Sequence, residues 1–152
     1  MSREIQLTIA VAVISGAAAL IRFGIGLLLR EPLPPALTPT TARAREFLRA
    51  CYNPHMPPEA RLLSSFEAVY FCCLAVSEHI GMALEQRAHP DIRVVELAFR
   101  ALGFPKKNWA TMHALLDWRA YPISPQPKAC TDEDAFLLAR TVYLQTRQYL
   151  QG

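Results

Sequence analysis

The sequence predicts an all-α protein, an up-and-down bundle of four to five helices preceded by a separate apolar helix. Three observations support this fold class. Apolar residues between positions 59 and 87 recur at alternating steps of four and three, the spacing of one face of a helix. Proline-rich segments divide the chain into helix-length stretches, and no stretch alternates apolar and polar residues as a half-buried strand does. We therefore expect a helical core without a sheet.

The first element is an apolar run that begins at Ile5 and ends at Leu29, interrupted by one charge, Arg22. A run of this length can cross a bilayer as a helix, and its many aliphatic residues outweigh the cost of one off-centre arginine. The flanking cations are asymmetric, which predicts that the C-terminal side is cytoplasmic. Arg3 precedes the run, whereas four cations follow it within twenty residues: Arg30, Arg43, Arg45 and Arg49.

Two other interpretations of residues 1–30 stay open. Small residues around Ser15 and Ala19 would suit cleavage of a secretory signal peptide, although the apolar run continues well beyond them. Alternatively, the protein is soluble and cytoplasmic, and this helix completes the bundle or a dimer interface. The domain organisation expected is an apolar helix over 1–30, a proline-rich linker over 31–41 and a helical domain over 42–152.

The helical domain is expected to begin with a short helix that Thr41 caps, followed by turn-rich residues 53–58. The long helix over 59–87 comes next and should lie centrally, because it is apolar on two sides. Its main stripe is predicted to be buried: Leu62, Phe66, Val69, Cys73, Val76, Ile80 and Ala83. A second stripe of mainly small residues is predicted to mediate self-association as a homodimer, through Ala68, Cys72, Ala75 and His79.

Three further helices complete the predicted bundle. A third helix starts around Pro90 and stops at Gly103, where glycine accepts the left-handed cap and Phe104 can pack back; its expected buried residues are Ile92, Val95, Phe99 and Leu102. The fourth runs from Lys106 to Tyr121, with Trp109, Met112, Leu116 and Ala120 inward. The last starts at Thr131, followed by acids that favour a helix N-terminus, and buries Ala135, Leu138, Val142 and Tyr149.

Composition limits the chemistry of this protein. The 152 residues carry a formal charge of +3, but the lysines and arginines are scattered, so RNA or nucleotide binding has no basic run to support it. The four cysteines, at positions 51, 72, 73 and 130, match neither a zinc module nor a CxxC pair. We expect free thiols in a reducing compartment, two or three of them buried, with no metal and no cofactor.

Several local phrases resemble the HEPN superfamily, the higher eukaryote and prokaryote nucleotide-binding helical domains. They are SSFEAVYFCCLAVSEHIG in the long helix, ALG at the end of the third, LLDWRAY in the fourth and TDEDAFLLARTVYLQTRQYL in the last. The resemblance covers residues 41–150 and excludes the apolar N-terminus. It implies a bundle of four or five helices, often dimeric, of a kind that includes metal-independent ribonucleases of toxin and defence systems.

The catalytic signature of that superfamily is an arginine and a polar residue followed, four to six positions later, by a histidine. Here the corresponding stretch holds Arg119 and Tyr121, and no histidine follows it. RNA cleavage needs a base for the 2′-hydroxyl and a cation for the phosphate, and Arg119 supplies only the second. Arg49 and His55 have the spacing, but they span a helix end and a turn, so we interpret them as surface residues.

The leading hypothesis is thus a non-catalytic HEPN-like interaction module, membrane-tethered and self-associating, with a protein partner. Arg119 and Tyr121 are its candidate binding residues. The alternative is a HEPN-type RNA endonuclease in which His113 replaces the missing base beside Arg119, and both residues are then the candidate catalytic pair. The third alternative is the soluble protein whose N-terminal helix completes the bundle or dimer.

Overall fold

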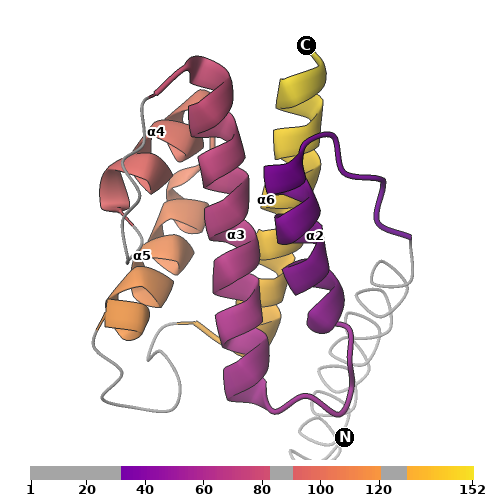
Figure 1. Ribbon diagram of the computed structural model, residues 1–152. Helices are drawn as coiled ribbons and strands as arrows, with labels where there is room; N and C mark the ends of the chain where they lie inside the picture. The colour runs from indigo at the N-terminus through magenta and orange to yellow at the C-terminus, as the bar shows by residue number, and fades with distance from the viewer. Residues whose placement is uncertain (1–31, 83–90, 121–129) are drawn as a thin grey trace, which may run out of the picture. The chain divides into compact units, whose positions relative to one another are not determined.

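The computed structural model describes residues 32–82, 91–120 and 130–152 (Figure 1). The chain divides into two compact units, Met1–Leu33 and Pro34–Gly152, and the second contains all the described helices. These helices are α2 to α6, and the described ranges contain no strand. The all-α prediction is confirmed, whereas the expected N-terminal helix and the proposed membrane segment lie outside the described residues.

Helix α2 (Pro39–Ala50) begins earlier than expected because Thr38, not Thr41, is its cap. The Thr38 side chain accepts a hydrogen bond from the Thr41 backbone N–H, and the Thr41 hydroxyl in turn accepts one from the Thr38 N–H. Pro39 occupies the first turn, where its missing N–H leaves no bond unmade. Thr41 is therefore a buried member of a capping box, and the segment expected to be a linker up to residue 41 already contains the first turn of the helix.

Helix α3 (Pro58–Ile80) is the centre of the bundle and packs against each of the other four described helices. Most of its predicted stripe is fully buried, from Leu62 to Val76. The expected continuation to residue 87 is wrong, since the helix ends at Ile80 and Gly81 adopts the left-handed conformation with φ 83°. Ile80 is consequently 45% exposed rather than buried.

Of the described helices, α3 alone is long and apolar enough by composition to cross a membrane. In its most apolar window, 56% of the residues are buried inside the bundle. Burial of this extent is what the core helix of a folded domain shows, so the length and composition of α3 are weak support for a membrane span.

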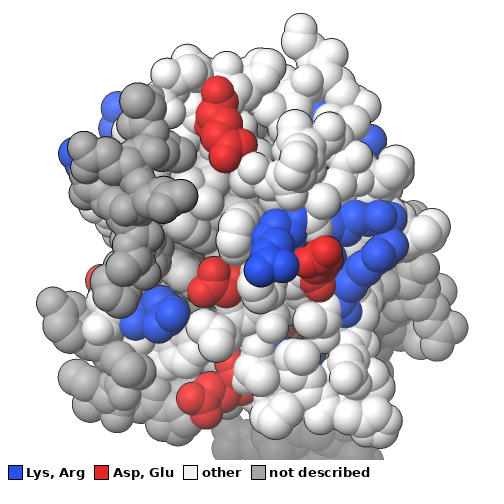
Figure 2. Space-filling model, viewed as in Figure 1, with Lys and Arg blue, Asp and Glu red and all other residues white. Residues whose placement is uncertain are grey.

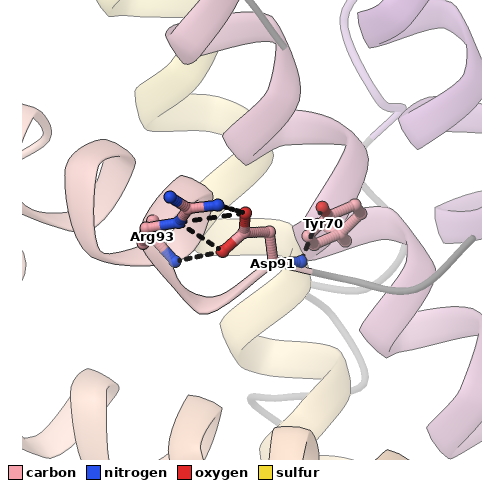
Figure 3. A network of polar contacts seen from close by, with 3 residues as sticks. All are labelled: Tyr70, Asp91 and Arg93. Atoms are coloured by element: carbon pink, nitrogen blue, oxygen red, sulfur yellow. Dashed lines mark hydrogen bonds and ion pairs between the residues drawn. The ribbon is translucent and has the colours of Figure 1, made fainter. Parts of the chain in front are cut away.

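Helix α4 (Ile92–Ala101) is tied to α3 at its first residues (Figure 3). The Asp91 backbone N–H donates to the Tyr70 hydroxyl at 2.9 Å, while the Asp91 carboxylate caps the helix by accepting from the Arg93 N–H. The buried face is Val94, Val95, Ala98 and Phe99, so Ile92, which was expected inside, is 43% exposed. Gly103 follows with φ 68° and lets the Phe104 ring return to 4.8 Å from Phe99, as the sequence predicted.

Helix α5 (Lys106–Ala120) packs against α3 and α6 through a face that matches the predicted one only at Met112. Its buried residues are Met112, Leu115 and Trp118, whereas Ala120 is exposed and Leu116 only half-buried. Trp109 is also half-buried, with its indole N–H donating to the Phe104 carbonyl at 3.1 Å.

Helix α6 (Asp132–Gln151) starts as expected, with Thr131 as the cap and Asp134 completing a capping box. Asp132 Oδ2 lies 2.9 Å from Arg61 Nη1, which joins the first turns of α6 and α3, so these two helices run parallel. Helix α2 runs the other way, since Thr40 near its start donates to Glu78 near the end of α3 at 2.8 Å. The parallel pair α3 and α6, with α2 antiparallel beside them, forms the core of the bundle (Figure 1).

Candidate functional site

A cavity of about 400 Å³ opens where the first turns of α3 meet the end of α5. Its lining comes from both helices and from the turn before α3: Pro57, Glu59, Ala60, Leu63, Trp118 and Arg119. The volume falls in the lower part of the range for ligand pockets and suits one or two side chains of a partner. Of the predicted site residues that the structure describes, Arg119 is the one that lines this cavity.

The side chain of Arg119 reaches toward α3, where Glu67 faces it. The distance from Arg119 Nε to Glu67 Oε1 is 4.0 Å, and the two side chains are 42% and 26% exposed. Burial raises the pKa of the Glu67 carboxyl, and the Arg119 charge opposes that rise. At this distance the pair is loose, so the guanidinium keeps donors available for a second anionic group.

The apolar part of the cavity is Leu63 beside Trp118. Leu63 is 39% exposed, while Trp118 is 8% exposed and forms one wall of the cavity. An apolar surface next to a partly exposed cation can hold an apolar group and orient a neighbouring carboxylate or phosphate. It offers a way to bind. The described lining residues include no histidine, cysteine, lysine or serine, and Glu59 is the one acidic group among them.

His113, the other candidate catalytic residue, is not brought to Arg119. Six residues on a helix turn the side chain through 600°, which leaves the two about 120° apart around α5. The His113 imidazole is exposed and stacks on Trp109, with ring centroids 6.1 Å apart. Tyr121, the second candidate binding residue, lies outside the described residues.

The small-residue stripe on α3 faces the inside of the bundle, and its proposed role in self-association needs correction. Ala68 and Cys72 are fully buried and Ala75 is 3% exposed, so a second copy of the chain cannot reach them. His79 is exposed, but its ring packs against Tyr149 of α6 at 5.6 Å. Homodimer formation stays a prediction, and it would have to use another face.

All four cysteines are free and buried, one or two more than expected. Burial raises the pKa of Cys72 to about 12, with a smaller opposing effect from the Thr146 hydroxyl, and raises the pKa of Cys130 to about 11. Burial also raises the pKa of Cys51 and Cys73. Thiols held in the protonated form are inert packing groups rather than nucleophiles. Within the described ranges no three His, Cys, Asp or Glu side chains cluster as metal ligands would.

The sequence did not point to Leu63, Glu67 or Trp118 as site residues. Leu63 could have been noticed, because it directly follows Leu62 of the buried stripe and is apolar at a position outside that stripe. Glu67 and Trp118 gave none, since their contribution depends on how α5 packs against α3.

No protein-family model matches this sequence, and neither a curated protein nor a solved structure resembles the chain closely enough to count as a match. The HEPN-like resemblance therefore stays a prediction.

Proposed function

We propose that this protein is a non-catalytic, HEPN-like helical interaction module, tethered to the cytoplasmic face of a membrane by the apolar residues 5–29. The observation that carries the binding role is the cavity between α3 and α5, where Leu63 and Trp118 lie next to Arg119. Its occupant in this proposal is a segment of a protein partner that offers an apolar side chain and an acidic group.

The chemistry of the cavity favours such a segment over a substrate. A partner that covers the exposed face of Leu63 gains about 25 cal/mol of binding free energy for each Å² of apolar surface removed from water. Arg119 fixes the orientation of the bound segment through a charge-assisted hydrogen bond. Glu59, exposed on the first turn of α3, repels an acidic group at its end of the cavity. The acidic group of the bound segment should therefore lie toward Arg119.

The separation of the two candidate catalytic residues supports the non-catalytic role. A HEPN-type nuclease needs an acid or base within hydrogen-bond reach of the reacting hydroxyl, and His113 stacks on Trp109 at a different side of α5 from Arg119. The order of elements, with a short α2, a long α3, two shorter helices and a long α6, is consistent with the HEPN-like resemblance.

The binding role is tested by site-specific photo-crosslinking in cells, with a photoreactive amino acid at Leu63 or at Leu144. Both leucines are 39% exposed, and Leu144 lies on α6 away from the cavity lining, so it is a matched control. We expect a discrete adduct from position 63 that is absent from position 144. Arg119→Ala should remove the adduct, whereas Arg100→Ala, at an exposed arginine of α4, should leave it. Equal adducts from both positions would rule out this cavity as the binding site.

The tether is tested separately, by fractionating membranes that contain the full-length protein and washing them with alkaline carbonate. A protein held by a membrane-spanning helix stays in the pellet, whereas a peripheral protein is released. Release would favour the alternative in which residues 1–30 belong to the bundle or to a dimer, and it would leave the crosslinking result unaffected.

A further inference from the structure

Arginines from two helices gather around the hydroxyl of Tyr143. Arg45 and Arg49 lie one turn apart on α2, and Arg147 lies one turn beyond Tyr143 on α6. Burial raises the pKa of Tyr143, and the charges of Arg45, Arg147 and Arg49 act against that rise, as cations close to the phenol do. Figure 2 shows blue side chains gathered over α2 around an acidic one. The structure thus assembles a basic surface that the scattered cations of the sequence did not reveal.

Few acids oppose this basic surface. Between residues 34 and 58 the sequence holds one acid, Glu46, which pairs with Arg43 at 3.3 Å. From residue 135 to the end of the chain it holds none, because the acids of α6 all stand in its first turn. Glu78, which Thr40 contacts, is the acid that α3 presents near the start of α2. Arg147 Nε is buried and has no hydrogen-bond partner among the described residues.

The same surface receives the chain where it enters the helical unit. The Tyr143 hydroxyl donates to the Pro34 carbonyl at 2.9 Å, which fixes residue 34 beside the arginines. Pro34 is five positions beyond Leu29, and a chain of that length reaches at most about 17 Å when extended. A bilayer that ends near Leu29 would therefore have its headgroups, which add roughly 5 to 7 Å beyond the hydrocarbon, close to this surface.

We propose that Arg49 and Arg147, with Arg45 beside them, form a docking surface for the anionic phospholipid headgroups of the membrane that holds the protein. The inference rests on the proposed tether, which supplies the proximity. Charge complementarity supplies the attraction, since each basic residue near an anionic leaflet strengthens binding about fivefold and salt screens the effect. Docking orients the bundle with α2 and α6 toward the membrane and leaves the Arg119 cavity, on α3 and α5, to partners.

The test uses full-length protein reconstituted into vesicles, with an environment-sensitive fluorophore on an introduced cysteine, Gln148→Cys, next to Arg147. Ala110→Cys, on exposed α5, carries the control label. We expect the label at 148 to respond to phosphatidylserine, to ignore pure phosphatidylcholine and to lose its response in high salt. The label at 110 should ignore the lipid charge.

Two double variants, each of which removes two positive charges, distinguish docking through the arginines from an effect of the net charge of the protein. Arg49→Gln with Arg147→Gln should weaken the docking equilibrium about 25-fold, whereas Lys106→Gln with Lys107→Gln, on the exposed start of α5, should leave it unchanged. Equal weakening by both pairs would overturn the proposal. A label at 148 that ignores phosphatidylserine, in protein that resists the carbonate wash, would overturn it while leaving the tether in place.

Failure of the tether gives a different result. If carbonate releases the protein, co-sedimentation with phosphatidylserine vesicles still measures docking, and loss of binding in the arginine pair alone would support the surface. A response at 148 to single-stranded RNA, but not to phosphatidylserine, would overturn the lipid assignment in favour of nucleic acid.

Discussion

The Tyr143 hydroxyl donates a hydrogen bond to the Pro34 carbonyl, two residues that lie 109 positions apart in the sequence. Tyr143 is fully buried within the bundle, so its ring is fixed and the hydroxyl has a defined partner. Because prolines 34 and 35 have no backbone N–H, this segment has few donors with which to hold itself. The hydrogen bond from Tyr143 thus holds the segment that precedes α2 against α6.

Replacing Tyr143 with phenylalanine should lower the free energy of unfolding by about 1 kcal/mol, because the Pro34 carbonyl loses its donor while the ring packing is kept. Tyr149→Phe is the matched control, since Tyr149 lies on the same helix and contributes a ring contact to His79. Urea denaturation of the full-length variants in one detergent gives both values. Equal stability of Tyr143→Phe and the wild type would show that the bond contributes nothing to the fold.

The pair of Glu67 and Arg119 makes a prediction about pH. Burial raises the pKa of Glu67 above its ordinary value of 4.5, so the folded protein keeps this proton to a higher pH than the unfolded chain does. The contribution of Glu67 to the free energy of unfolding must then fall as the pH rises above the ordinary value of 4.5. Glu67→Gln removes the titrating carboxyl, so the stability of the wild type relative to this variant should decline as the pH rises above about 4.5.

Denaturation midpoints measured every half pH unit test this slope. Glu59→Gln changes an exposed glutamate on the same helix and should leave the slope of the wild type in place. A wild type that gains stability over Glu67→Gln as the pH rises would contradict the prediction. It would mean that attraction to Arg119 outweighs the burial of the carboxylate.

Helix ends could be predicted where the capping residues are explicit in the sequence. Thr131 with the acids after it, and Gly103 followed by Phe104, specify their ends locally and were identified correctly. The end of α3 was not, because Met82 and Ala83 continue the apolar spacing beyond Gly81 and conceal the stop. Capping by Thr38 was missed for a similar reason, since three threonines around Pro39 all suit the role.

Packing between helices could be predicted only in part. The stripe of α3 is clear because its apolar residues keep the alternating spacing of four and three from Leu62 to Val76, over about four turns. Helix α5 is apolar on several sides, so spacing alone permits more than one buried face, and contact with α3 and α6 selects the one with Leu115 and Trp118. The candidate site depends on the same choice, because Glu67 and Arg119 stand 52 positions apart and share no local pattern.

The capping box at the start of α6 makes a prediction about stability. Thr131 accepts from the Asp134 N–H at 3.1 Å, so Thr131→Ala should leave this donor unpaired and cost about 1 kcal/mol. Thr141→Ala is the control, because that hydroxyl donates to the Leu137 carbonyl within the same helix, at an exposed position. Urea denaturation should show at most a few tenths of that loss for Thr141→Ala. Comparable losses for the two variants would indicate that the cap is not special.

The buried cysteines make a prediction about thiol reactivity. The thiolate is the reactive form, and a pKa of about 12 leaves Cys72 with about a thousandth of the thiolate that its ordinary value of 9.0 would give. Cys72 is also completely buried. Its reaction with a disulfide reagent at pH 8 should therefore be limited by the rate at which the protein unfolds locally or globally. The other three thiols, which are also buried, should be similarly slow.

The controls for thiol reactivity use unfolded protein and an exposed cysteine. Protein unfolded in guanidinium without reductant should react at once with four equivalents of the reagent, which also tests whether the thiols are free. Ala110→Cys, at an exposed position, should add one fast equivalent to the native protein. A fast natural thiol, identified by Cys→Ser variants, would show that its site is open to solvent and would remove that cysteine from the core.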